Sequence, residues 1–153
     1  EGPRCSASVT LDLRHMVDGD RCGLAAFNGH SGLLTIVRDG KSYKLVQSNT
    51  LVHLTDREKA ITGVDEDVVE QVGLKRCKKI QLRIDGDFTP GKDIATFYYK
   101  IGKGEWTPIG EPFKMQFDYR RLFMGTRYAI FNYATKQAGG YVDVDSFDYS
   151  REE

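Results

Sequence analysis

The chain has 153 residues, of which 40% are hydrophobic and 29% are charged, the composition of an ordinary globular domain. Its 22 basic and 22 acidic residues cancel, which disfavours a protein that neutralises nucleic-acid phosphates or anchors to membranes through polybasic segments. No run of 18 apolar residues occurs, so the sequence predicts no transmembrane helix.

The chain opens EGPRC, without Met and without an apolar signal segment, so we expect either processing or a piece of a longer polypeptide. The three cysteines, Cys5, Cys22 and Cys77, cannot all pair within one chain and match no zinc-binding spacing. We interpret them as buried or half-buried thiols, with room for one disulfide in an oxidising compartment. Their number fits cytoplasmic, periplasmic and secreted enzymes alike, and a secreted or periplasmic location is our expectation.

Alternating apolar residues predict short strands through the first half of the chain. Val9, Leu11 and Leu13 alternate with polar residues, as in a half-buried strand. Further strands are predicted at 22–27, 33–37, 42–46 and 67–74, with turn signals at 18–20 and 39–40. Residues 47–66 show no clear pattern and are predicted to form a long connection.

The second half continues the same pattern. Strands are predicted at 80–84, 94–101, 105–109 and 113–117, followed by a final pair at 127–133 and 141–149. The loop of this pair, 134–140, contains Thr135, Lys136 and Gln137 before a Gly-Gly pair. About ten short strands with turn signals roughly every 8–12 residues predict one antiparallel all-β sandwich over residues 1–153.

No catalytic motif appears in the sequence. Nucleophile elbows, zinc-protease helices, redox dithiols and phosphate loops are all absent. The pairs Asp85/Asp87 and Asp143/Asp145 each share a sheet face if their strand continues. Such pairs can cap turns, face solvent or catalyse glycoside hydrolysis. Asp143 and Asp145 are also candidate calcium ligands.

Aromatic residues are the second group of candidate functional residues, with eight Tyr, eight Phe and one Trp. Flat aromatic faces bury the CH-rich faces of sugar rings, so an aromatic-rich sandwich without a catalytic motif is compatible with carbohydrate binding. The residues placed in or near loops are the candidates for exposure: Phe27, Tyr133, Tyr141 and Trp106. Those at alternating strand positions are predicted to be core: Phe97, Tyr99, Phe131 and Phe147. His30, in a glycine-rich loop, is the histidine we expect to contact a ligand.

Four stretches together resemble a known family. GDRCGLAAFNGHSG (19–32), LRIDGDF (82–88), ATFYYKIGKGEWTPIGEPFKM (95–115) and FMGTRYAIFNYATKQAGGYVDVDSFDY (123–149) are similar to the C-terminal β-sandwich of family 43 glycoside hydrolases. Those enzymes are β-xylosidases, α-L-arabinofuranosidases and relatives that act on xylan and arabinan. The resemblance covers nearly the whole chain and implies a concanavalin-like, laminin-G-like sandwich of two antiparallel sheets.

The resemblance has further implications. In that family the catalytic carboxylates lie on an N-terminal five-bladed propeller, so we expect no glycosidase activity from this chain alone. Family sandwiches start earlier than Glu1, which implies that one or more N-terminal strands are missing and that a sheet edge is filled by another segment or a partner. The loop that the family can lend to the rim of the active-site pocket corresponds to Phe27, Asn28 and His30.

The sequence therefore supports three hypotheses. The first is a non-catalytic accessory sandwich that shapes the pocket of a family 43 hydrolase and binds xylan-type or arabinan-type carbohydrate. The second is a structural or interaction domain without sugar affinity. The third is a free-standing lectin-like domain that depends on calcium.

Overall fold

The computed structural model describes residues 4–28, 30–54, 61–74, 77–87, 92, 94–114 and 127–152, without the side chains of 28, 51–54, 61–65, 127 and 152. Every regular element in this part of the chain is a β-strand, and every strand pairing is antiparallel. The strands are β1 (Arg4–Asp12), β2 (Arg21–Asn28), β3 (His30–Asp39), β4 (Ser42–Leu54), β5 (Ile61–Leu74), β6 (Lys79–Asp87), β7 (Ile94–Lys100), β8 (Thr107–Pro108), β9 (Phe113–Lys114), β10 (Arg127–Tyr133) and β11 (Asp143–Glu152).

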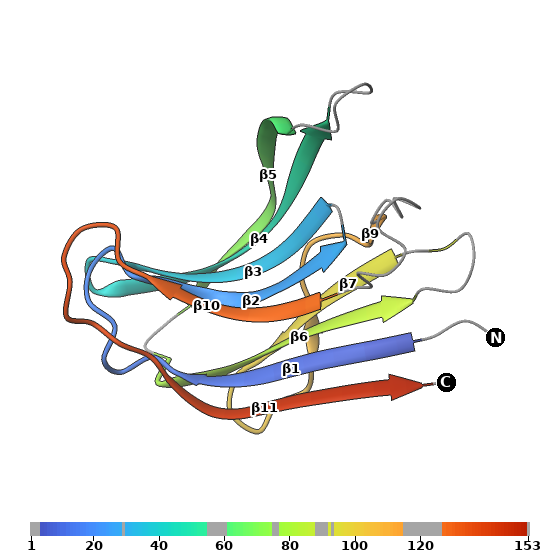
Figure 1. Cartoon of the computed structure of the whole chain (residues 1–153). Coiled ribbons are helices and arrows are strands. Elements are labelled where there is room, and N and C mark those ends of the chain that lie inside the picture. The colour runs from blue at the N-terminus through green and yellow to red at the C-terminus, as the bar shows by residue number, and fades with distance from the viewer. Residues whose placement is uncertain are drawn as a thin grey trace.

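These strands form two sheets that pack face to face, which confirms the predicted sandwich (Figure 1). Sheet A has the order β11-β1-β6-β7-β8, with β9 also paired to β7, and sheet B has the order β10-β2-β3-β4-β5. Figure 1 shows β4 and β5 rising away from sheet A, so sheet B is curved. No helix in the described part of the chain is long and apolar enough to cross a membrane.

The core lies between the sheets and is made by alternate residues of the central strands. The largest side chains that are almost completely buried include Leu11, Leu24, Leu34, Ile36, Leu45, Ile80, Leu82, Ile84 and Phe97. Phe97 of sheet A reaches Gly32 of sheet B so closely that a Cβ at Gly32 would stand 2.5 Å from the ring. Gly40, with a φ of 62°, makes the predicted turn between β3 and β4.

Several predictions need correction, and one of them is the glycine-rich loop expected around His30, because His30 begins β3. Most of 47–66 belongs to the long strands β4 and β5, while 55–60 lies outside the described residues. A register shift between Gln47 and Ser48 interrupts the ladder there, and Gln47 is a fully buried polar residue, so the apolar alternation is lost. The strands predicted at 105–109 and 113–117 contract to β8 and β9, and 115–117 is not described.

All three cysteines are free thiols, so the structure contains no disulfide. Cys22 is buried, and this burial raises the pKa of its thiol to about 12. The Sγ of Cys5 lies 3.1 Å from the hydroxyl of Tyr128, across the space between the two sheets. Burial raises the pKa of both groups, so both stay protonated at neutral pH.

Candidate functional site

The outer face of sheet B carries an aromatic row. Strand pairing sets Phe131 of β10 opposite Gly23 of β2 and Tyr133 opposite Arg21. Because Gly23 has no side chain, the ring of Phe131 lies over it, and a Cβ there would stand 3.0 Å from the ring. The rings of Phe131 and Tyr133 stack with their centroids 6.1 Å apart. The prediction that Phe131 belongs to the core is therefore wrong, because Phe131 pairs with Gly23, and the residues of β2 that face the core are its neighbours Cys22 and Leu24.

Beside this row lies a hollow that we call the sheet B groove. Its floor is made by outward-facing residues that are nevertheless buried, among them Thr35, Val37 and Val46. Its volume is about 230 Å³. The groove is lined by Arg21, Leu33, Thr35, Val37, Lys44, Val46, Thr50, Glu66, Val68, Gln71 and Tyr133.

The chemistry of the sheet B groove is that of a binding surface. Tyr133 is 49% exposed and offers a flat ring with a hydroxyl at its end. Arg21, Lys44 and Gln71 add hydrogen-bond donors around an apolar floor, the usual pattern of a small-molecule site. Glu66 is the only carboxylate among the lining residues, so the groove holds no pair of carboxylates for glycoside hydrolysis.

Phe27 lies on the same outer face as Tyr133 but at the other end of β2. Its register partner is Arg127, six ladder positions from the pair of Arg21 and Tyr133, which is about 20 Å along a strand. Phe27 is 41% exposed, and the adjacent hairpin brings Asn28 opposite the half-buried His30. The side chain of Asn28 lies outside the described part of the chain. Phe27 and His30 thus belong to one hairpin, at a distance from the sheet B groove.

Tyr141 belongs to a different surface. Its ring stacks on His15 with a centroid distance of 4.3 Å, and its backbone N–H donates to the carbonyl of His15. In the same loop, the hydroxyl of Thr135 donates to the carbonyl of Gly19, and the ammonium of Lys136 pairs with Asp18. The loop 134–142 is therefore fastened to the connection between β1 and β2, and one face of Tyr141 is covered.

Trp106 lies beside the outer face of sheet A, on the opposite side of the sandwich from the sheet B groove. The guanidinium of Arg83 lies 4.3 Å from the ring centre of Tyr98 and 5.1 Å from that of Trp106. Lys100 also approaches Trp106. The structure therefore separates Trp106 from Phe27 and Tyr133, with which the sequence grouped it.

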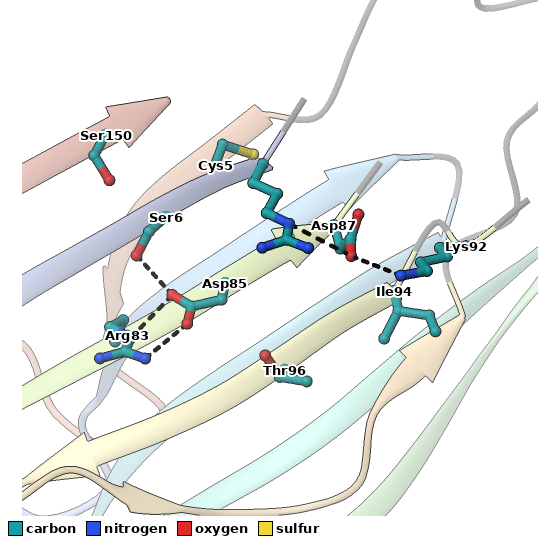
Figure 2. Close-up of a pocket in the computed structure, with 11 residues that line it drawn as sticks. Cys5, Ser6, Arg83, Asp85, Asp87, Lys92, Ile94, Thr96 and Ser150 are labelled. Carbon is teal, nitrogen blue, oxygen red and sulfur yellow. Dashed lines mark hydrogen bonds and ion pairs between the residues drawn. The ribbon is translucent and has the colours of Figure 1, made fainter. Parts of the chain in front are cut away.

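A second hollow, the sheet A pocket, opens on this outer face and has a volume of about 620 Å³ (Figure 2). Figure 2 shows polar side chains of β1, β6 and β7 around it, with Ser150 of β11 and Lys92 at its margins. Within it, Asp85 accepts hydrogen bonds from the hydroxyl of Ser6, at 2.6 Å, and from Arg83, at 2.9 and 2.7 Å. The pocket is lined by Arg4, Cys5, Ser6, Arg83, Asp85, Gly86, Asp87, Lys92, Ile94, Thr96 and Ser150.

The sheet A pocket holds the predicted pair Asp85 and Asp87, which do share a face because β6 continues through both. Asp87 lies 3.8 Å from Arg4 and 3.7 Å from Lys92. With Arg83 on Asp85, each of the two carboxylates is therefore paired with a cationic side chain. The alternation of Arg83, Asp85 and Asp87 with apolar residues is the sequence signal for this polar row.

The two candidate calcium ligands lie on β11. Asp145 forms an ion pair of 2.6 Å with Lys79, and a register shift at this point of the β1–β11 ladder leaves Asp145 without a pairing partner. Asp143 lies opposite Asp12, whose carboxylate is held by Arg14. Among the described residues, no group of three or more His, Cys, Asp or Glu is arranged to hold a metal ion. The calcium interpretation therefore depends on the two aspartates alone.

Comparison with known proteins identifies the family. The family described as the β-xylosidase C-terminal concanavalin A-like domain matches residues 1–150. The chain belongs to this family. It is an accessory C-terminal domain of the kind that family 43 glycoside hydrolases carry. No curated protein sequence matches the chain.

Solved structures agree with this assignment. A family 43 glycoside hydrolase, engineered in its active site to display both endo-xylanase and exo-arabinofuranosidase activity, is 30% identical with a TM-score of 0.81. The match covers 97% of this chain and 29% of that one. A bifunctional GH43–CE protein of Bacteroides eggerthii is 33% identical with a TM-score of 0.78, over 97% of this chain and 18% of that one.

A third structure, a mutant of the GH43 protein BlXynB from Bacillus licheniformis, is 16% identical with a TM-score of 0.64, which shows the shared fold. That match covers 95% of this chain and 27% of the other. The domain thus spans less than a third of the length of each of these three chains.

Proposed function

We propose that this domain packs against the N-terminal five-bladed propeller of a family 43 glycoside hydrolase and completes the rim of its active site. The observation that carries the proposal is Phe27, a 41% exposed aromatic ring at the end of a regular antiparallel hairpin. An exposed ring held by paired strands can meet a sugar at little conformational cost. Phe27, Asn28 and His30 are the residues we assign to the rim.

We further propose that the sheet B groove binds a stretch of xylan-type or arabinan-type oligosaccharide. The half-exposed Tyr133 supplies the stacking surface, while Arg21, Lys44 and Gln71 supply donors for sugar hydroxyls. The groove and the hairpin lie on the same face of sheet B, so one polysaccharide chain could follow that face toward the rim. Tyr141 and Trp106, on other surfaces, have no part in this proposal.

The rim assignment is tested in the full-length hydrolase. Phe27→Ala and His30→Ala should each lower kcat/KM on xylo-oligosaccharides roughly tenfold, which corresponds to the loss of about 1.4 kcal/mol of transition-state stabilisation. Trp106→Ala, on the outer side of sheet A, is the matched aromatic control and should leave kcat/KM unchanged. Equal activity of all three variants and the parent would reject the rim role.

The groove is tested by titrating this 153-residue chain with xylohexaose and with arabinoxylan and measuring the heat of binding by calorimetry. We expect a Kd between roughly the micromolar and millimolar ranges, with binding lost in Tyr133→Ala and kept in Trp106→Ala. Trp106 is the only tryptophan and lies beside the sheet A pocket, so its fluorescence separates the two hollows. Binding heat without a change in Trp106 fluorescence supports the sheet B groove. A change in Trp106 fluorescence on binding would instead indicate that the sugar binds at the sheet A pocket. Absence of heat from a folded sample would leave a scaffold without sugar affinity.

A further inference from the structure

A second hollow adjoins the sheet B groove, and we call it the basic hollow. Its volume is about 160 Å³, and it shares Arg21, Val37 and Lys44 with the groove. Its lining includes four cationic side chains and one carboxylate: Arg21, Arg38, Lys44, Lys136 and Asp39. One end of the proposed sugar site therefore carries an excess of positive charge.

Strand register shows how two of these cations are placed. Tyr133 of β10 lies opposite Arg21 of β2, Arg21 lies opposite Val37 of β3, and Val37 lies opposite Lys44 of β4. Residues directly opposite each other in antiparallel strands share one face of the sheet. Arg21 and Lys44 thus flank the shorter Val37, with their backbones two strand spacings apart, or about 10 Å. An anion placed over Val37 is within reach of both long side chains.

Neither of these two cations has an anionic partner in the protein. Among the described residues, Arg21 and Lys44 form no ion pair. The Nε of Arg21 is buried and has no hydrogen-bond partner in the same part of the chain, so it is not committed to a protein acceptor. In the sheet A pocket, by contrast, cationic side chains are paired with Asp85 and Asp87. The basic hollow is therefore the better place for an anionic group from outside.

The remaining charged residues of the basic hollow leave this excess in place. Lys136 is paired with Asp18 at 3.1 Å, so its charge is offset. The guanidinium of Arg38 donates to two backbone carbonyls, which do not cancel its charge. Asp39 is an exposed carboxylate and is the only one among the lining residues. It weakens the attraction for an anion without removing it.

We propose that the basic hollow binds the carboxylate of a uronic acid carried by the oligosaccharide in the sheet B groove. This inference rests on the proposed sugar binding of the groove, and it names xylan-type chains with uronic acid branches as the preferred ligand. A planar carboxylate accepts paired hydrogen bonds from a guanidinium such as that of Arg21, and Lys44 adds a second charge. Val37 lies two strand spacings, about 10 Å, from Tyr133, so one oligosaccharide can contact both.

The test compares two ligands that differ only in charge. One is a xylo-oligosaccharide with a single glucuronic acid branch, and the other is the same molecule after reduction of its carboxyl group to an alcohol. Titration calorimetry of this chain at low salt should give a Kd about tenfold lower for the acidic ligand. The ratio of the two Kd values separates the effect of the carboxylate from the contacts of the sugar hydroxyls.

Substitutions should change this ratio in opposite directions. Lys44→Gln and Arg21→Gln should each lower the preference for the acidic ligand, whereas Asp39→Asn should raise it. Lys92→Gln, at the sheet A pocket, is the matched control and should leave the ratio unchanged. With the parent chain, about 1 M salt shortens the Debye length to about 3 Å and should remove most of the preference without any substitution.

Equal Kd values of the two ligands for the parent chain at low salt would overturn the inference and leave the groove as a site for neutral sugars. If neither ligand binds, the sugar-binding proposal for the groove fails, and this inference fails with it. A preference that is lost in Lys92→Gln and kept in Lys44→Gln would also overturn the inference, because the carboxylate would then bind at the sheet A pocket.

Discussion

The contact between Gly32 and Phe97 offers a sharp test of how the two sheets fit together. Gly32 faces the core from β3, and a Cβ at this position would stand 2.5 Å from Cζ and 2.8 Å from Cε1 of the Phe97 ring. The ring is only 2% exposed, so it has no free space into which to move. Adding a methyl group to a packed interior of this kind typically costs about 1–3 kcal/mol.

We therefore expect Gly32→Ala to lower the free energy of unfolding by about 1–3 kcal/mol relative to Gly73→Ala. Gly73 is the matched control because it is also a strand glycine, while a Cβ there meets nothing within 4 Å. In a domain of this size, each 1 kcal/mol corresponds to a shift in Tm of roughly 2–4 °C, which urea titration or calorimetry resolves.

The double variant Gly32→Ala with Phe97→Leu removes the clash at its source. If the reasoning is right, the two substitutions are coupled, and the double variant is more stable than the sum of the single effects by about 0.5–3 kcal/mol. Equal stability of Gly32→Ala and Gly73→Ala, or strict additivity of the double variant, would refute the claim that Phe97 occupies the space left by Gly32.

Two further predictions concern polar contacts. Hydrogen bonds from Arg14 hold the pKa of Asp12 below its usual range, so this carboxylate stabilises the fold above the ordinary aspartate pKa of about 3.9 and loses that effect as the pH falls below it. The stability difference between the parent and Asp12→Asn should accordingly be largest near pH 7 and shrink toward pH 2 in urea titrations, and a difference independent of pH would contradict this assignment. Thr135→Val removes the 2.6 Å hydrogen bond to the carbonyl of Gly19 and should cost about 1 kcal/mol, whereas an unchanged urea midpoint would mean that the loop is held by its other contacts.

The strand pattern could be predicted where apolar residues alternate without interruption. In β6, Ile80, Leu82 and Ile84 alternate with polar residues, and the structure buries them in the core. The strand predicted at 127–133 is also found, as β10. In β4 and β5 the predicted strands at 42–46 and 67–74 are found, but their continuation through 47–54 and 61–66 was missed, because register shifts and the buried Gln47 break the period of two. Local pattern carries no signal for pairing between such irregular strands.

The candidate site could be predicted only in part. The sequence singled out Phe27 and Tyr133 as loop-placed aromatics, and both are exposed on the outer face of sheet B. It could not show that Phe131 lies on the outer face, since that depends on which face of β10 turns toward the core when the strand pairs with β2. It grouped Trp106 with them, although the folded chain sets Trp106 against Arg83 beside the other sheet.

By itself, the sequence determined the class of this domain, because alternation along each strand records which side chains meet the core and which meet water. It also determined the family, through stretches that match over nearly the whole chain. The tertiary structure alone decided which faces carry the sheet B groove and the sheet A pocket, because strands distant in sequence combine to make them. It also decided the exposure of Phe147, a residue predicted to be core, because the exposure of a side chain depends on what lies across the sandwich and not on its neighbours in the chain.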